Sequence, residues 1–337
     1  MDAILLVGGQ GTRLRPLTAR RHKSLVPICN RPAIEHLLEW LHHSRIRRAI
    51  LALGLANQDL ATRYPPGTHL GIEILPIIEH TRLESGGAIR NAVAQANIQE
   101  RFLVLNGDIY LQFDLHQALA AHIAHNADLT IALHHVDDPT PFGVAVCDQH
   151  HLITRFIEKP PPGQAPSHLV NAGAWIFERP LVDQIPPGPV RVEETLFPTL
   201  IARQRPVLGY RIPGPWADIG TPSRYLALHH TLLPHTNAIA PTATVHPTAQ
   251  IHTTAIGPGS LIGPGAHITR SVIWENVHIH PGATIVDTIL ADGVTVGQNA
   301  HLHHCIVGPG ATIDPHATPP PGTIIQADAR YHGTNAH

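Results

Sequence analysis

The sequence predicts an α/β domain followed by a parallel β-helix, and two observations carry this prediction. Up to about residue 230, short apolar runs alternate with helix-like segments, which is typical of βαβ units around a Rossmann-like, mainly parallel sheet. From about residue 237, branched apolar residues recur every 17 residues. A length of 337 residues suits two domains. We therefore expect domains over residues 1–230 and 237–325, with a tail over 326–337.

The elements of the α/β domain follow from hydrophobic spacing. Apolar residues at positions 34, 37, 38 and 41 have the helical period, whereas short continuous apolar runs indicate buried strands. Ligands on such sheets bind beyond the carboxyl ends of the strands, where Gly8–Gly9 and Asn106–Asp108 fall. The expected strands are Ala3–Val7, Arg48–Leu53, Ile72–Ile78, Phe102–Leu105 and Leu129–His134, and the expected helices are Ala33–Leu41, Gly87–Ala96 and Leu115–His125.

The repeat region has three apolar positions per period, separated by steps of six, six and five residues. Three short strands per coil, with these residues pointing into a triangular core, explain this hexapeptide-like pattern. The position that continues the third series, 319, is Pro, and we expect the tail from about residue 326 to fray. The three series are Ile239, Ile256, Ile273, Leu290, Val307, Ile324; then Val245, Ile262, Ile279, Val296, Ile313; and Ile251, Ile268, Ile285, Leu302.

Composition argues against several classes of protein. The net charge is −2 and Lys and Arg form no run, so neither nucleic acid nor an anionic membrane is an expected partner. Ala3–Val7 is far shorter than the roughly 20 residues of a membrane helix. The start also lacks the basic region of a signal peptide, so we expect a cytoplasmic protein. Cys29, Cys147 and Cys305 match no zinc or redox spacing and are expected to be reduced. The 28 His residues are scattered, and we interpret them as surface composition, with a metal role as the weaker alternative.

A glycine-rich loop follows the first expected strand and begins Gly8-Gly9-Gln10-Gly11-Thr12-Arg13. Such a loop brings bare N–H groups close to an anion, and Arg13 and Arg15 add guanidinium groups that match phosphate oxygens. Leu14 stands where the dinucleotide fingerprint needs a third Gly, and the Gly-Lys-Ser/Thr of a Walker A loop is missing. Taken alone, the loop predicts either a phosphate site or a plain strand-to-helix turn.

The eleven residues from Gly8 to Thr18 resemble the signature of the sugar nucleotidyltransferases, Gly-Gly-x-Gly-Thr-Arg-Leu-x-Pro-Leu-Thr. Within that family, the chain most resembles the mannose-1-phosphate guanylyltransferases that end in a hexapeptide-repeat, left-handed β-helix. The resemblance implies that the β-helix of this chain is also left-handed. It continues through motifs in the family's order and spacing, namely Lys23, Leu83–Ala88, Asn106–Asp108, Phe142–Val144, Phe156–Pro160, Asn171–Gly173 and Trp216–Pro222.

The resemblance implies that a sugar 1-phosphate and an NTP give an NDP-sugar and pyrophosphate, with mannose 1-phosphate and GTP as the first expectation. The sugar phosphate attacks as an ionised group, so the protein has to align two anions and neutralise charge. By resemblance, Arg13, Lys23 and Asp108 are catalytic, and Asp108 and Asp218 hold Mg²⁺ through hard oxygen donors. The implied nucleotide residues are Gly8, Gly9, Gly11, Thr12, Arg13, Gly86 and Gly87, and the implied sugar-phosphate residues are Gly143, Glu158, Lys159 and Asn171.

Two positions depart from the family pattern. Glu84 stands where the family commonly has Gly in the loop beside the base, which leaves the nucleotide preference open. His22 replaces the Pro before the lysine, so we expect a looser turn in front of Lys23. Glu193 and Glu194 could reach the sugar but are not part of the expected set.

Other functions remain open from sequence. The same reaction can use glucose 1-phosphate with dTTP or UTP, or heptose 1-phosphate with GTP. A non-catalytic homologue that senses nucleotide sugars is a second class, although it has no need of the charges of Lys23, Asp108 and Asp218. A third is an acyltransferase that uses His278, His280 or His303 of the β-helix, but the coils are short and show no loop insertion. We also expect a homo-oligomer formed through the β-helix.

Overall fold

The structure is a computed structural model that describes residues 1–54 and 57–333. It has two compact units, and the chain enters each of them twice. The first contains residues 1–9 and 34–217, and the second contains residues 10–33 and 218–337. Residues 10–33, which the sequence places in the α/β domain, thus group with the β-helix. Among the helices of the described residues, none combines the length and apolar character needed to cross a membrane.

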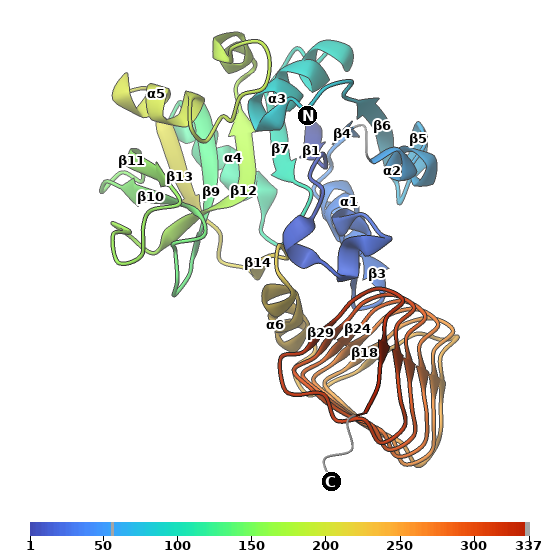
Figure 1. Ribbon diagram of the computed structural model, residues 1–337. Helices are drawn as coiled ribbons and strands as arrows, with labels where there is room; N and C mark the ends of the chain where they lie inside the picture. The colour runs from blue at the N-terminus through green and yellow to red at the C-terminus, as the bar shows by residue number, and fades with distance from the viewer. Residues whose placement is uncertain (55–56, 334–337) are drawn as a thin grey trace. The chain divides into compact units, whose positions relative to one another are not determined.

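The first unit is built on a ten-stranded sheet with the order β11-β10-β12-β7-β1-β4-β6-β5, in which β9 pairs with β12 and β13 (Figure 1). β1 lies parallel to β4 and β7, β4 to β6, and β9 to β13, whereas β12 is antiparallel to β7 and β9. The mixed, mainly parallel sheet is therefore confirmed. The strands are β1 (Asp2–Leu6), β4 (Arg48–Leu53), β5 (Gly67–His69), β6 (Ile72–Ile78), β7 (Phe102–Asn106), β9 (Leu129–His135), β10 (Gly143–Cys147), β11 (Ile153–Glu158), β12 (Leu169–Phe177) and β13 (Val207–Arg211).

The helices of this unit follow the predicted pattern with small differences at their ends. The third helix begins at Glu84 rather than Gly87. Two short strands, β8 (Ile109–Leu111) and β14 (Trp216–Asp218), pair outside the main sheet. Ile4, Val104, Trp175 and Phe177 are fully buried in the core. The helices are α1 (Ala33–His43), α2 (Gln58–Arg63), α3 (Glu84–Gln95), α4 (Leu115–Ala124), η5 (Arg179–Gln184) and α5 (Leu196–Ala202).

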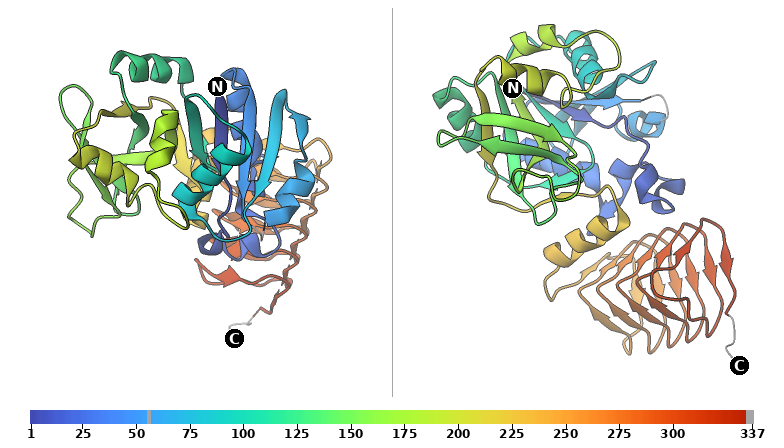
Figure 2. Two further views of the ribbon diagram at one scale, coloured as in Figure 1. Left: turned by 90° about the horizontal axis from the view of Figure 1, so that it is seen from above. Right: turned by 60° about the vertical axis from the view of Figure 1, so that its left-hand side comes forward.

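The second unit contains a parallel β-helix whose coils stack in register at the 17-residue interval (Figure 2). The inward-pointing residues of the central coils, such as Ile256, Ile268 and Ile285, are fully buried. The stacked parallel strands are consistent with the expected left-handed β-helix. The first sheet contains β15 (Ala238–Ile239), β18 (Ala255–Ile256), β21 (Val272–Ile273), β24 (Ile289–Leu290), β27 (Ile306–Val307) and β29 (Ile324–Ile325); the second contains β16 (Thr244–Val245), β19 (Leu261–Ile262), β22 (His278–Ile279), β25 (Thr295–Val296), β28 (Thr312–Ile313) and β30 (Arg330–Tyr331); and the third contains β17 (Gln250–His252), β20 (His267–Thr269), β23 (Thr284–Val286) and β26 (His301–His303).

The last coil departs from the predicted series. Val307 pairs with Ile325, not Ile324, so the interval grows by one residue. Ile325 is 5% exposed, whereas Ile324 is 52% exposed, and the prediction that Ile324 points into the core is wrong. In this coil the run Pro319–Pro321 stands where the third sheet would have its next strand, and Pro cannot donate to the ladder.

The two ends of the β-helix also differ from the prediction. Ile239 in the first coil is 43% exposed, since no coil covers it on that side. Part of the predicted tail is ordered, because β30 pairs with β28. Residues 334–337 of that tail lie outside the described residues.

The N-terminal part of the second unit has little regular structure. It contains three single-turn 3₁₀ helices and a small antiparallel hairpin. The second unit also contains helix α6, which precedes the β-helix in the sequence. These elements are η1 (Thr12–Leu14), η2 (Leu17–Ala19), η3 (Lys23–Leu25), β2 (Pro27–Ile28), β3 (Arg31–Pro32) and α6 (Pro222–Leu232).

Candidate active site

The first unit brings together residues expected at the sugar side. Gly143, the first residue of β10, pairs with Glu158, the last residue of β11. A Cβ on Gly143 would lie 2.5 Å from Cζ of Phe156 and 2.7 Å from Oε2 of Glu158, so glycine leaves room for both side chains. Lys159 follows directly, and its Nζ lies 2.8 Å from Oε1 of Glu158. A paired carboxylate and ammonium group thus stand at the end of one strand.

Asn171 of β12 joins this group through strand pairing. Val144 pairs with Val170, which places Asn171 beside Gly143. Oδ1 of Asn171 accepts hydrogen bonds from N of Gly173 at 3.0 Å and from Nε1 of Trp175 at 2.8 Å. Since these bonds fix the amide, its Nδ2 is the group that can donate to a substrate hydroxyl.

The loop expected beside the base forms the start of α3. Glu84 has a φ of 57°, a left-handed conformation that favours glycine, which accounts for Gly as the common family residue. The Glu84 carboxylate lies 2.8 Å from Nε of Arg82 and 3.2 Å from Nε of Arg191. Gly86 and Gly87 are buried and face residues 188–190, so they serve close packing inside the protein.

Glu193 links this loop to the sugar side. Oγ of Ser85, in the first turn of α3, donates to Oε2 of Glu193 at 2.5 Å, and it accepts from N of Val192 at 3.1 Å. Burial raises the pKa of the Glu193 carboxyl above its usual value, and the nearby negative charge of Glu158 raises it further. Glu193 therefore belongs to the cluster around Glu158, although it is not among the expected site residues. The adjacent acidic pair Glu193-Glu194 was the available signal.

The second unit holds the remaining loop residues. Gly11 has a φ of 63°, and a Cβ on it would lie 2.9 Å from Cβ of Lys23, so the loop lies directly against this lysine. Oγ1 of Thr18 donates to O of Gly11 at 2.8 Å and closes the loop. Nδ1 of His22 accepts from N of Ser24 at 3.2 Å and caps η3, where Lys23 begins. The imidazole thus supplies a cap at the position where the family has Pro.

The side chains of Arg13 and Asp218 both lie close to the backbone of Gly220 in the second unit. A Cβ on Gly220 would lie 2.5 Å from Oδ1 of Asp218 and 3.2 Å from Nη2 of Arg13. Oδ2 of Asp218 lies 3.1 Å from Nη1 of Arg224, and its Oδ1 accepts a hydrogen bond from N of Gly220. The carboxylate is thereby oriented by its own neighbours. Its oxygen donors suit Mg²⁺, as do those of Asp108.

The other expected residues lie at strand ends or on the surface. Gly8 and Gly9 follow β1 in the first unit and are exposed, whereas Thr12 is exposed in the second. Asp108 is half-buried after β7, in a turn whose Gly107 N donates to O of Leu6 at 3.0 Å. The residues expected to bind phosphate are thus divided between the two units.

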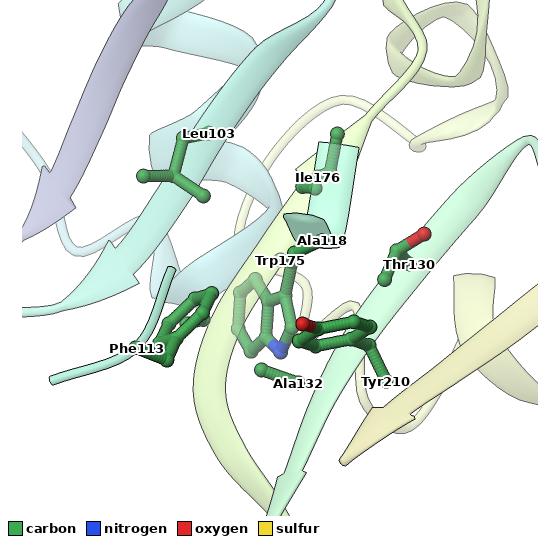
Figure 3. Close-up of a pocket in the computed structure, with 9 residues that line it drawn as sticks. Leu103, Phe113, Ala118, Thr130, Ala132, Trp175, Ile176 and Tyr210 are labelled. Carbon is green, nitrogen blue, oxygen red and sulfur yellow. The ribbon is translucent and has the colours of Figure 1, made fainter. Parts of the chain in front are cut away.

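A cavity in the first unit does not qualify as this site. Its volume is about 10 Å³, the size needed for roughly one water molecule, so it admits no nucleotide. Figure 3 shows that its walls are mostly apolar, with Phe113, Trp175 and Tyr210 among the residues that line it. Most of its lining residues belong to strands β7, β9, β12 and β13.

The histidines expected for an acyltransferase lie on regular coils. His278, His280 and His303 are exposed in the described coils. Asp287, His303 and His304 lie close enough to share an ion. However, the guanidinium of Arg270 already donates two hydrogen bonds to the carboxylate of Asp287. The positive charge of Arg270 thus already balances the negative charge of Asp287.

Comparison with known proteins gives the family. A nucleotidyl transferase family model matches residues 2–234, which is more than half of the chain. This chain belongs to the nucleotidyl transferase family. A second model, the GMPPB C-terminal domain, matches residues 234–329 and so covers the β-helix.

Individual members of the family are similar over the α/β part. The mannose-1-phosphate guanylyltransferase of Mycobacterium tuberculosis is 35% identical over 228 residues, which are 67% of this chain and 63% of that protein. The mannose-1-phosphate guanylyltransferase catalytic subunit beta of Dictyostelium discoideum is 34% identical over 230 residues, with the same coverage of 67% and 63%. The corresponding subunit of Drosophila melanogaster is 34% identical over 227 residues, covering 66% of this chain and 60% of that protein. The matched region therefore spans less than two thirds of each relative's length.

Proposed function

We propose that this member of the nucleotidyl transferase family is a mannose-1-phosphate guanylyltransferase. In this reaction an oxygen of mannose 1-phosphate attacks the α-phosphorus of GTP, and the bond from that phosphorus to the bridging oxygen breaks. GDP-mannose forms and pyrophosphate leaves. The names of the relatives at 34–35% identity support this choice of substrates.

The observation that carries the proposal is the cluster of Gly143, Glu158, Lys159 and Asn171. Carboxylate and amide groups are suited to sugar hydroxyls, and an ammonium group is suited to a phosphate. We assign Glu158 and Asn171 to the sugar hydroxyls and Lys159 to the phosphate. Glu193 lies close enough to Glu158 for the two carboxyl groups to interact, and it accepts a hydrogen bond from Ser85.

The lysine content adds an independent argument. Lys23 and Lys159 are the two lysines of the whole chain, which otherwise uses arginine as its cation. The two side chains are not interchangeable at a phosphate, because lysine offers a compact charge and arginine a planar fork. Lysine thus occurs at the two positions where the family motifs have it.

The other charges of the proposal are those of Arg13, Lys23 and Asp218 in the second unit and of Asp108 in the first. We assign Arg13 to the triphosphate and Lys23 to the α-phosphate, where negative charge builds as the new bond forms. Gly8, Gly9, Gly11 and Thr12 are assigned to nucleotide binding. Asp108 and Asp218 would hold Mg²⁺, which neutralises charge on the phosphate oxygens when it is bound.

The test is pyrophosphate release by the purified full chain in Mg²⁺, measured over a matrix of NTPs and sugar 1-phosphates. We expect turnover with GTP and mannose 1-phosphate, and loss of that turnover in Asp108→Asn. Turnover only with another pair, such as UTP with glucose 1-phosphate or GTP with heptose 1-phosphate, would keep the reaction and change the substrates. Binding of a nucleotide sugar without turnover for any pair would favour a sensing homologue.

The β-helix is also expected to form a homo-oligomer. We propose this assembly as part of the function, and light scattering on the purified chain tests it. A mass of one chain at micromolar concentration would exclude it.

A further inference from the structure

The segment 10–33 is attached to the β-helix at several points within the second unit. Nδ2 of Asn30 donates to O of Ala238 at 2.7 Å and to O of Ile256 at 2.9 Å, which are backbone atoms of two successive coils. A Cβ on Gly308 would lie 3.0 Å from Cβ of Pro16. The β-helix therefore touches the segment on both sides of Lys23 in sequence.

Arg21 makes the most extensive of these contacts. Its Nη1 lies 3.1 Å from Oε1 of Glu275, and its Nη2 lies 3.0 Å from Oδ2 of Asp292. Its guanidinium carbon lies 5.4 Å from the centroid of the Trp274 ring, within range of a cation–π interaction. Only 19% of the Arg21 side chain is exposed. Three β-helix residues thus surround one guanidinium group.

The β-helix side of this contact is held by burial and by its own hydrogen bonds. Trp274 is fully buried, and its Nε1 donates to the hydroxyl of Tyr225 at 2.9 Å. Glu275 and Asp292 lie one 17-residue repeat apart, and Oδ1 of Asp292 accepts from N of Glu275 at 3.3 Å. Burial raises the pKa of Asp292 and the positive charge of Arg21 opposes this shift, so the ionised carboxylate depends on its partner.

The same guanidinium also reaches the helix that contains Lys23. Nη1 of Arg21 lies 3.5 Å from O of Leu25, the last residue of η3. Lys23 is the first residue of η3, so it lies between the backbone of Arg21 and the point that the Arg21 side chain contacts. A change in the guanidinium position therefore acts on the last residue of the turn that Lys23 begins.

We propose that Arg21 is a positioning residue, and that its clamp on Trp274, Glu275 and Asp292 makes the β-helix part of the phosphate site by setting the position of Lys23. This inference rests on the proposed function, in which Lys23 stabilises the α-phosphate. It goes beyond a supporting or oligomerising role for the β-helix.

Kinetics of matched variants test the clamp. Because a misplacement of about 1 Å can cost on the order of a hundredfold in rate, we expect Arg21→Met to lower kcat by about tenfold to a hundredfold. KM for the sugar phosphate should stay within about twofold, since the sugar cluster lies elsewhere in the chain. Arg21→Lys should recover part of the loss, because it restores the charge without the fork.

Arg20 provides the control. It also pairs with a β-helix acid, Asp328, but both side chains are more than half exposed. Such pairs contribute little, so Arg20→Met should keep kcat within about twofold of wild type. Equal losses in Arg20→Met and Arg21→Met, or an unchanged kcat in Arg21→Met, would overturn the proposal. Asp292→Asn combined with Arg21→Met should lose little more than Arg21→Met alone.

Amine labelling gives a readout that needs no turnover. The chain has two lysines, so mass spectrometry after brief acetylation reports Lys23 against Lys159 as an internal reference. We expect the ratio of Lys23 to Lys159 labelling to rise in Arg21→Met and to stay at the wild-type value in Arg20→Met. An unchanged ratio in Arg21→Met would overturn the clamp even if the enzyme is active. A changed ratio in a chain without turnover would keep the clamp and reject the proposed function.

Discussion

The backbone of Gly11 lies against the side chain of Lys23, with 2.9 Å between Cβ of Lys23 and the point where a Cβ on Gly11 would stand. The φ of Gly11 is 63°, so this residue supplies both the left-handed turn and the close approach. Two family motifs that are 12 residues apart in the sequence are thus one structural feature.

Gly11→Ala tests this feature. A left-handed conformation costs a residue other than glycine roughly 1–2 kcal/mol, and the new methyl group would also push on Lys23. We expect a loss of stability in this range or above, together with a clear fall in kcat. Gly265→Ala is the matched control, since Gly265 has a φ of 67° and open space around its Cα. It should lose similar stability, measured by urea unfolding, and keep its kcat; equal kcat in the two variants would contradict the account.

The Glu193 carboxyl predicts a pH dependence of stability. Its pKa is raised in the folded protein, first by burial and further by Glu158, so folding favours the protonated form. The stabilising contribution is complete below the unfolded value of about 4.5 and is lost as pH rises through the folded value. Gln does not ionise, so Glu193→Gln does not lose stability in this way. We expect the Tm of Glu193→Gln minus the Tm of wild type to be larger at about pH 8 than at about pH 5.

Glu194→Gln is the control for this measurement. Glu194 is adjacent to Glu193, but its side chain is 51% exposed. The difference in Tm between Glu194→Gln and wild type should be the same at about pH 5 and at about pH 8. A constant difference between Glu193→Gln and wild type across this pH range would show that Glu193 is not held in the protonated form.

Glu84 tests the nucleotide preference. Glu84→Gly relieves the left-handed strain but loses the contacts with Arg82 and Arg191, and these effects of about 1 kcal/mol each should nearly cancel in stability. Glu84→Gln keeps the strain and removes the charge. If the carboxylate helps to select guanine, both variants should lower kcat/KM for GTP relative to UTP. A change in Glu84→Gly alone would assign the effect to the backbone.

The register of the last coil gives a stability test. Ile325 is 5% exposed and Ile324 is 52% exposed, which is the reverse of the strict 17-residue series. Ile325→Ala should cost about 2 kcal/mol, the low end for a buried Ile, because it lies near the end of the β-helix. Ile324→Ala should change the free energy of unfolding by less than about 0.5 kcal/mol. Equal costs for the two variants would contradict the observed register.

The sequence predicts much of the fold because hydrophobic periods are local. The strands expected at Arg48–Leu53 and Ile72–Ile78 have these same bounds in the structure, and both are short apolar runs. The coils between Ile256 and Val307 follow for the same reason, since each interior position repeats. The shift to Ile325 could not be read from the repeat, because it occurs after three prolines that follow the regular coils.

The site is harder to predict because its contacts join distant segments. Motifs locate Glu158, Lys159 and Asn171, but they do not show that Glu193 bonds to Ser85, more than 100 residues away. Likewise, the sequence gives no reason to group residues 10–33 with the β-helix. That grouping depends on polar contacts such as the one between Arg21 and Glu275. These contacts join residues far apart in the sequence and follow no repeating sequence pattern.

The stoichiometry of products from GTP and mannose 1-phosphate in Mg²⁺ tests the proposed guanylyl transfer directly. We predict equal amounts of GDP-mannose, measured by mass spectrometry, and pyrophosphate, with neither product formed by Lys23→Met. Inorganic phosphate without any sugar nucleotide, or no product from any pair of NTP and sugar 1-phosphate, would contradict it.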